Sequence, residues 1–220
     1  MSTPLTIALP AGRLAGESTA FFRKCGLADF QIPEKSRELL FYDSTGDYRI
    51  VLVRSQDVPT YVLQGGADVG ITGRDVLAER GYELTMPLQL HFGYCRLSLA
   101  APEANCEGLL QKPHLRVATK YTNLAQNFFH GKGISIEVIK LYGSIEIAPL
   151  LGMADCVVDL VSTGATLAAN GLREMEAIFE STAMLVVNRA AIALQTERIN
   201  LLLEKFRAEL AREREAGAGA

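Results

Sequence analysis

A turn rich in hydroxyls and glycine, set between an apolar strand and a helix, is the part of this 220-residue chain best suited to chemistry. Ser162-Thr163-Gly164 follows the apolar run 156–161, and a helix is predicted to begin at Ala165. Backbone N–H groups at a helix start converge on an anion, and the helix dipole favours negative charge there. The hydroxyls of the turn and of Thr166 add donors, and the glycine lets the backbone approach a ligand closely. The turn therefore predicts a phosphate-binding site.

Two carboxylates precede this turn and extend the predicted chemistry. Asp155 is the weaker candidate, because an Ala-Asp pair can simply begin a strand. Asp159 lies within the apolar run, where an unpaired carboxylate would be costly. A carboxylate here can bind sugar hydroxyls or a metal-bound group. For the turn alone, an ordinary N-cap is the favoured interpretation; with the acidic strand, a phosphorylated sugar is favoured.

Composition and charge narrow the classes of protein. Hydrophobic residues make up 49% of the chain and charged residues 21%, which is normal for a globular protein. The net charge of −3 argues against a broad nucleic-acid surface. Neither a signal peptide nor a stretch long enough to span a bilayer is visible, so we expect a cytoplasmic protein without a membrane contact. The cysteines and histidines show no metal-ligand spacing, and the sequence leaves any metal ligands unknown.

Short apolar runs alternate with amphipathic ones, which predicts an α/β protein with a largely parallel sheet. Breaks near 91–94 and 177–181 predict two lobes, the first made of 1–93 plus 181–220 and the second of 94–180. Such an arrangement would place a cleft between the lobes, at the carboxyl ends of strands. The predicted strands are Leu5–Leu9, Leu39–Tyr42, Arg49–Val53, Asp68–Ile71, Arg96–Ala100, Arg116–Thr119, Ser135–Ile139, Cys156–Val161 and Ala183–Val187. The predicted helices are Leu14–Cys25, Asp57–Gln64, Asp75–Arg80, Asn123–His130, Ile145–Leu151, Ala165–Ala169 and Thr196–Arg212.

Other strand ends carry polar residues that could complete a site. Arg13 follows the first strand and could clamp a phosphate, although its spacing slightly favours a solvated arginine. Thr72-Gly73 could form a polar wall of the cleft. Lys120-Tyr121 could meet an anion and stack on a base, or could be a surface lysine and a packing tyrosine. Nothing local marks Arg37.

Taken together, these segments resemble one family, ATP phosphoribosyltransferase, from about Leu5 to the terminal helix. The resemblance implies a two-lobed fold like that of periplasmic solute-binding proteins. It also implies a reaction: N1 of ATP attacks C1 of phosphoribosyl pyrophosphate (PRPP), and pyrophosphate leaves with Mg²⁺, in the first step of histidine biosynthesis. The segments that carry it are 9–14, 57–62, 67–77, 118–121, 143–149 and, most specifically, 159–171.

The resemblance assigns a role to each group of matching residues. It implies that Ser162, Thr163, Gly164, Ala165 and Thr166 hold the 5-phosphate, that Glu146 and Asp159 bind the ribose hydroxyls, that Arg13 and Arg37 face the pyrophosphate as catalytic residues, and that Thr72, Gly73, Lys120 and Tyr121 line the ATP site. The chain departs from the family at Ala11, where a lysine is usual, and at Thr122, where a proline is usual. The first change removes a cation from the expected leaving-group region.

The length of the chain carries a further expectation. The long form of the family has a C-terminal regulatory domain, for which this chain has no room after its terminal helix. The resemblance therefore implies the short form, which works in a hetero-oligomer with a regulatory subunit resembling histidyl-tRNA synthetase.

Two other functions stay open at this point. A non-catalytic two-lobed module, which senses a solute or an effector, could share the architecture, since a fold does not fix a function. Another phosphoribosyltransferase acting on a free base is also possible. The acidic strand before the turn favours a phosphosugar over a plain amino acid, and the extent of the resemblance disfavours the free base.

Overall fold

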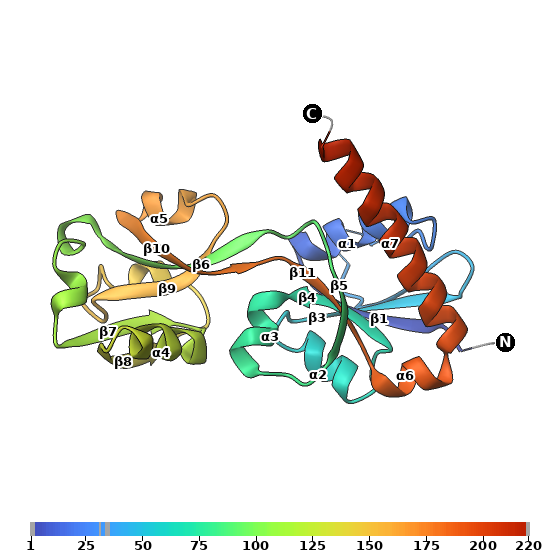
Figure 1. Cartoon of the computed structure of the whole chain (residues 1–220), viewed down its shortest axis with the longest axis horizontal. Helices are drawn as coiled ribbons and strands as arrows, with labels where there is room; N and C mark the ends of the chain where they lie inside the picture. Colours follow the sequence, from blue (N-terminus) through green and yellow to red (C-terminus); the bar gives the residue numbers. More distant parts are fainter. Residues whose placement is uncertain (1–2, 31, 34–35, 219–220) are drawn as a thin grey trace. The chain divides into compact units, whose positions relative to one another are not determined.

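The computed structural model describes residues 3–30, 32–33 and 36–218 (Figure 1). The chain divides into two compact units, each with its own β-sheet. The first unit contains residues 1–77, 82–93 and 182–220, and the second contains 78–81 and 94–181. The first unit is therefore built from both ends of the chain.

The first unit has a six-stranded mixed sheet, whose spatial order is β2-β3-β1-β4-β11-β5. Strands β3, β1 and β4 are parallel, whereas β2, β11 and β5 pair antiparallel with their neighbours. In chain order the strands are β1 (Leu5–Pro10), β2 (Leu40–Tyr42), β3 (Tyr48–Val53), β4 (Val69–Gly73), β5 (Thr85–Gln89) and β11 (Ala183–Val187).

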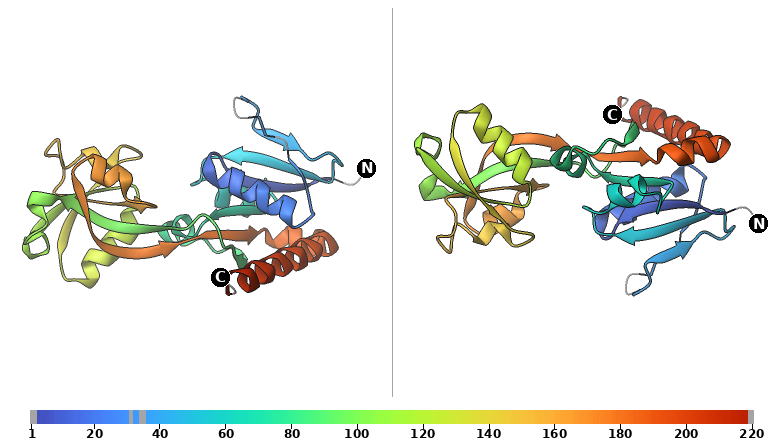
Figure 2. Two further views of the ribbon diagram at one scale, coloured as in Figure 1. Left: turned by 90° about the horizontal axis from the view of Figure 1, so that it is seen from above. Right: turned by 90° about the horizontal axis from the view of Figure 1, so that it is seen from below.

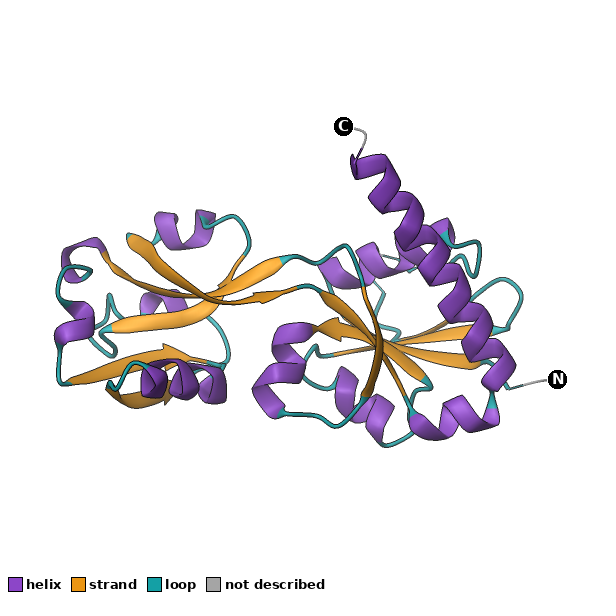
Figure 3. Ribbon diagram, in the orientation of Figure 1, coloured by secondary structure: helices purple, strands orange, loops and turns teal. Residues whose placement is uncertain are grey.

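Helices cover both faces of this sheet (Figure 3). The buried strand β1 alternates, because Leu5, Ile7 and Leu9 pack with α1 and α7 while Ala8 packs with α2. Phe206 of α7 meets the ring of Phe21 edge-on, with 4.8 Å between centroids, and so ties the terminal helix to α1. The helices are α1 (Arg13–Lys24), α2 (Val58–Leu63), α3 (Arg74–Arg80), α6 (Arg189–Leu194) and α7 (Thr196–Ala218). The last residues of α3, 78–80, belong to the second unit.

The second unit has a five-stranded mixed sheet in the order β10-β6-β9-β7-β8. Strands β9, β7 and β8 are parallel, while β6 runs antiparallel to both β9 and β10. Helix α4 and the 3-10 turn η2 pack on one face, and α5 and the 3-10 turn η3 pack on the other. The elements are β6 (Cys95–Pro102), η1 (Glu103–Asn105), η2 (Leu109–Gln111), β7 (His114–Thr119), α4 (Thr122–Gly131), β8 (Ser135–Lys140), η3 (Ile145–Ile147), β9 (Cys156–Val161), α5 (Ala165–Ala169) and β10 (Leu172–Ser181).

The α/β class and most elements are as predicted, but the expectation of a largely parallel sheet is wrong, since both sheets are mixed. Strands β5 and β10 and helix α6 were not predicted. Pro87 interrupts β5, which is tolerated because β5 is an edge strand. Two register shifts disturb the alternation of β10, which is also an edge strand. The helix expected over 145–151 is only the short turn η3.

Figure 2 gives two further views of the same elements. Among the residues that the structure describes, no helix combines the length and the apolar character needed to cross a membrane.

Candidate functional site

A cavity of about 260 Å³ lies in the second unit where β9 ends. Its described wall contains the end of the strand, the turn that follows, the first residues of α5, and one residue of η3. The lining residues are Glu146, Val157, Asp159, Leu160, Val161, Ser162, Thr163, Gly164, Ala165, Thr166 and Leu167. The structure therefore brings together, in one cavity, the residues that the resemblance assigns to the 5-phosphate and the ribose hydroxyls, whereas Asp155 and Arg13 lie outside it.

The cavity begins where β9 loses one of its two neighbours. The last residue of β7, Thr119, pairs with Val158, whereas pairing with β6 continues to Val161. The Thr119 hydroxyl donates to the Val158 carbonyl at 2.6 Å and so closes the β7 side of the ladder. Asp159 is the next residue, and its carboxylate Oδ1 accepts the Leu160 N–H at 2.8 Å. This position leaves Asp159 half-buried in the cavity wall.

The turn after β9 is shaped by one glycine. Gly164 has φ +82°, a left-handed conformation that strains any residue with a Cβ. The Thr163 Oγ1 accepts the Ala165 N–H at 3.4 Å, a weak contact at the helix start. Because α5 has only five residues, its dipole is small, and the expectation that the helix dipole favours an anion carries little weight here. The backbone N–H groups and the exposed hydroxyls are the donors that remain.

Two carboxylates share the cavity with these donors. Glu146 is the second residue of η3, and Ser144, which has φ +49°, directly precedes this turn. The half-buried side chain of Glu146 and that of Asp159 both line the cavity. Carboxylates repel a phosphate but accept hydrogen bonds from hydroxyls. The arrangement thus suits a ligand with a phosphate at one end and hydroxyls at the other.

Asp155 has a structural position and does not line the cavity. Its Oδ2 accepts the Arg116 N–H at 2.8 Å, and its Oδ1 accepts from Lys112 Nζ at 3.2 Å. Burial raises the pKa of Asp155, but these hydrogen bonds and the nearby positive charges outweigh it and hold the pKa below its ordinary value. The carboxylate ties β9 to the start of β7, which agrees with its weaker ranking from sequence.

The Lys120-Tyr121 turn lies at the end of β7, in the second unit but outside the cavity wall. Tyr121 is 1% exposed and packs in the core, while Lys120 Nζ lies 4.9 Å from its ring centroid. The start of α4 is capped by a residue that sequence reasoning missed. Glu79 accepts the N–H of Asn123 and the N–H of Leu124, each at 3.0 Å. No sequence signal marks Glu79, because its partners lie more than 40 residues away.

The other candidates belong to the first unit. Arg13 is the first residue of α1 and pairs with Glu17 at 2.9 Å, with 61% of its side chain exposed. Arg37 is exposed, between α1 and β2. Thr72 is fully buried at the end of β4, and no partner for its hydroxyl is found among the described residues. Any side chain at Gly73 would clash with Asp75, since an added Cβ would lie 2.1 Å from the Asp75 Oδ1.

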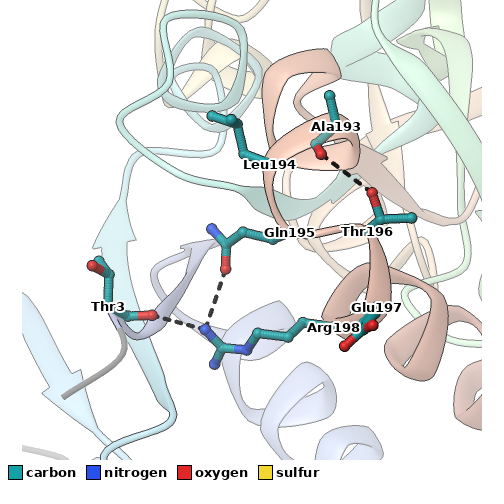
Figure 4. Close-up of a pocket in the computed structure, with 7 residues that line it drawn as sticks. All are labelled: Thr3, Ala193, Leu194, Gln195, Thr196, Glu197 and Arg198. Carbon is teal, nitrogen blue, oxygen red and sulfur yellow. Dashed lines mark hydrogen bonds between the residues drawn. The ribbon is translucent and has the colours of Figure 1, made fainter.

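A larger cavity, of about 640 Å³, lies elsewhere in the first unit, around the junction of α6 and α7 (Figure 4). The side chains of Arg198, Gln195 and Thr196 in its wall bond to the protein itself. Arg198 Nη1 donates to the Thr3 carbonyl at 2.7 Å and to Gln195 Oε1 at 3.2 Å. Thr196 donates to the carbonyl of Ile192. These contacts anchor the start of β1 to α7, and none of the residues predicted to bind a ligand is among the described residues that line this larger cavity.

Comparisons with known proteins show the family to which the chain belongs. Residues 54–208 match the family model described as HisG, ATP phosphoribosyltransferase. A protein named ATP phosphoribosyltransferase from Syntrophotalea carbinolica is 45% identical over 96% of this chain and 97% of its own. One of the same name from Variovorax paradoxus is 48% identical over 92% of this chain and 96% of its own.

Solved structures show the same likeness. A chain of the ATP phosphoribosyl transferase (HisG:HisZ) complex from Thermotoga maritima has a TM-score of 0.79 and 33% identity, over 94% of this chain and 99% of that chain. The periplasmic aliphatic sulphonate binding protein SsuA from Escherichia coli has a TM-score of 0.58 at 14% identity, covering 100% of this chain and 76% of its own. The second likeness concerns the fold alone, which is two-lobed α/β.

The bonds of Asp155 predict a pH-dependent contribution to stability. We expect Asp155→Asn to lower the free energy of unfolding by about 1–2 kcal/mol near neutral pH, because charge-assisted hydrogen bonds are lost. A carboxyl whose pKa is lowered by folding stabilises above its unfolded pKa of about 3.9, and this contribution is lost as the pH falls through the lower folded value. Urea unfolding at neutral and acid pH measures the difference. Glu137→Gln, at an exposed carboxylate of the same sheet, is the control; an equal loss in both variants would contradict the assignment.

Proposed function

We infer from these matches what the chain catalyses, since it belongs to the ATP phosphoribosyltransferase family. It transfers the 5-phosphoribosyl group of PRPP to N1 of ATP. The family catalyses the first step of histidine biosynthesis. The observation that carries the proposal is the cavity in which a phosphate-type turn and two carboxylates meet, inside the segment that the family model matches. In the reaction, the adenine N1 forms a bond to C1 of the ribose, while the bond from C1 to the pyrophosphate oxygen breaks with inversion.

We assign the PRPP-binding roles to the cavity residues. The turn from Ser162 to Thr166 would hold the 5-phosphate through its backbone N–H groups and hydroxyls. Glu146 and Asp159 would accept hydrogen bonds from the ribose hydroxyls. Both sets line one cavity, which supports a single ligand that carries the phosphate and the hydroxyls together.

The remaining roles fall to residues outside the cavity wall. Arg13 and Arg37 would face the pyrophosphate and stabilise its developing charge, and their exposure leaves both guanidinium groups accessible. Ala11, at the position where a lysine is usual in the family, adds no positive charge near the pyrophosphate. Thr72, Gly73, Lys120 and Tyr121 would contribute to the ATP site. Since the side chains of Thr72 and Tyr121 are buried, these two would act by supporting the site.

We propose that the two units are the two lobes expected from the sequence, with 94–180 carrying the PRPP-binding turn and 1–93 plus 181–220 forming the other lobe. The chain has little covalent chemistry to perform. Catalysis would come from holding N1 and C1 in line and from stabilising the charge of the leaving pyrophosphate. No step of this reaction requires a covalent intermediate on the protein.

The family uses a metal ion, and we propose that it is Mg²⁺. The described residues contain no cluster of three or more His, Cys, Asp or Glu that could hold a metal by itself. Mg²⁺ typically binds substrate phosphates, waters and one or two carboxylates. Glu146 and Asp159, the two carboxylates of the cavity, would supply the protein ligands of such a site, and the substrate would supply the others. When bound, the ion would neutralise charge on the leaving pyrophosphate.

We further propose a protein partner and a location. The Thermotoga maritima structure is that of a HisG:HisZ complex, and this chain spans 99% of the chain it matches there. By analogy, this chain would assemble with a regulatory subunit resembling histidyl-tRNA synthetase, in a cytoplasmic hetero-oligomer without nucleic acid or membrane.

The direct test is formation of phosphoribosyl-ATP by the purified chain from ATP, PRPP and Mg²⁺, with and without the candidate regulatory subunit. We expect product from the chain alone and a changed rate with the partner. Absence of product under both conditions, from a folded protein, would overturn the proposal in favour of a binding module. Product with a free base in place of ATP would identify a different phosphoribosyltransferase.

The cavity assignment predicts a selective loss of PRPP affinity. Asp159→Asn and Thr163→Val should each raise the dissociation constant for PRPP about tenfold, because the first removes the charge and one acceptor oxygen that would bind ribose hydroxyls, and the second removes a hydroxyl donor to the charged phosphate. Calorimetric titration measures it, with circular dichroism to confirm the fold. Ser135→Ala, which removes a hydroxyl from the edge strand of the same sheet, should leave the affinity unchanged. Unchanged affinity in both cavity variants would refute the assignment.

The role of Arg13 predicts a loss of turnover. Arg13→Ala should lower kcat about a hundredfold with little change in KM, because the charge on pyrophosphate develops in the transition state. Steady-state kinetics distinguish the two parameters. Arg23→Ala removes a similarly exposed arginine from the same helix, where it pairs with Asp29, and should be neutral. A rise in KM alone would show that Arg13 only binds substrate.

A further inference from the structure

A charged network lies beside the phosphate-type turn, and the functions assigned so far do not use it. Arg96 of β6 bonds Glu174 of β10 in a bidentate manner, with Nε and Nη2 each 2.5 Å from a carboxylate oxygen. The third guanidinium nitrogen, Nη1, donates to the carbonyl of Ser162 at 3.3 Å. One side chain therefore connects an edge strand to the first residue of the turn.

The pairing register places this network on the cavity face of the sheet. Arg96 lies opposite Val161, and Ser98 lies opposite Asp159. Val161 and Asp159 line the cavity, and alternate residues of a strand share a face. Glu174 also accepts a hydrogen bond from the Ser98 hydroxyl at 2.8 Å. The network thus joins two neighbouring strands, β6 and β10, to the turn that follows β9, on the face of the sheet that carries Asp159 and Val161.

The bond to Ser162 has a consequence for the next residue. A trans peptide unit is planar, with its C=O and N–H pointing in opposite directions. Once Arg96 holds the Ser162 carbonyl, the N–H of Thr163 is directed away from Arg96. Thr163 lines the cavity, and its N–H would be one of the donors to a bound phosphate.

The network also controls charge near the turn. The Glu174 carboxylate lies on the face that would receive a phosphate, where an unpaired negative charge would oppose binding. The hydrogen bonds from Arg96 are the main cause that lowers the pKa of Glu174, and that from Ser98 adds to it. The carboxylate is therefore ionised at neutral pH, and Arg96 balances it.

We propose that Arg96, held by Glu174, is a positioning residue for PRPP binding, which orients the Ser162–Thr163 peptide of the 5-phosphate turn and neutralises the nearby carboxylate. This inference rests on the proposed function of the turn. Arg96 itself would not touch the reacting atoms. The sequence shows Arg96 only as the first residue of a strand, and Glu174 lies in a strand that the pattern did not predict.

The test compares PRPP and ATP binding in variants of the full chain. Arg96→Gln should raise the dissociation constant for PRPP about tenfold, because a hydrogen bond from the Thr163 N–H to a charged phosphate would be weakened, while ATP affinity stays close to that of the parent. Arg96→Lys keeps the positive charge but cannot hold Glu174 in bidentate fashion and reach Ser162 together, so an intermediate loss is expected. Arg173→Gln is the control, because Arg173 is in the same strand as Glu174 and pairs at 2.7 Å with the exposed Glu103.

The outcomes separate the inference from the function on which it rests. Tight PRPP binding by folded Arg96→Gln, or by Arg96→Lys if the first variant does not fold, overturns the inference. An equal loss of PRPP and ATP affinity also overturns it, since a general structural defect would act on both. If Thr163→Val weakens PRPP binding and the Arg96 variants do not, only the positioning role fails. If Thr163→Val binds PRPP normally, the proposed function of the turn fails first.

Discussion

Every buried backbone N–H and C=O group needs a hydrogen-bond partner, and the candidate site follows from this constraint. Strand β9 is central in its sheet, and it meets this need through β7 on one side and β6 on the other. Its pairing with β7 ends at Val158, whereas its pairing with β6 continues to Val161. The last stretch of β9 therefore has one paired edge and one open edge. The cavity forms along the open edge, and the turn that follows supplies N–H groups outside any ladder.

The same constraint explains why the site combines opposite electrostatic properties. A turn leaving a sheet presents donors and attracts anions. The open edge exposes Asp159, and η3 adds Glu146 from another part of the chain. A bare phosphate would gain from the first feature and be repelled by the second. A ligand that also offers hydroxyls or a bound cation satisfies both, and for this reason the proposed phosphorylated sugar fits the two features together better than it fits the turn alone.

The sequence predicted those parts of the site whose contacts are local in the chain, and it did not predict the parts whose contacts join distant residues. The segment from 156 to 169 carries its own signals, namely an apolar run, a glycine turn and a helix start, and β9 and α5 have the predicted bounds. Arg96, Glu79 and Glu174 carry no such signals. Each acts on a residue 40 or more positions away, through pairings that only the folded sheet establishes. Glu174 was harder still, because register shifts break the alternation of β10.

The place of β11 in the first sheet has a consequence for biosynthesis. This strand lies between β4 and β5, and β5 has β11 as its neighbour in the sheet order. The ribosome makes β1 to β5 first, yet their sheet stays incomplete until residues 183–187 emerge. The second unit, in contrast, has its last strand once residue 181 is made. Domains generally fold as units during synthesis. The second unit, which is encoded in the middle of the chain, can therefore fold before β11 is made, whereas the sheet of the first unit is completed only when β11 is added.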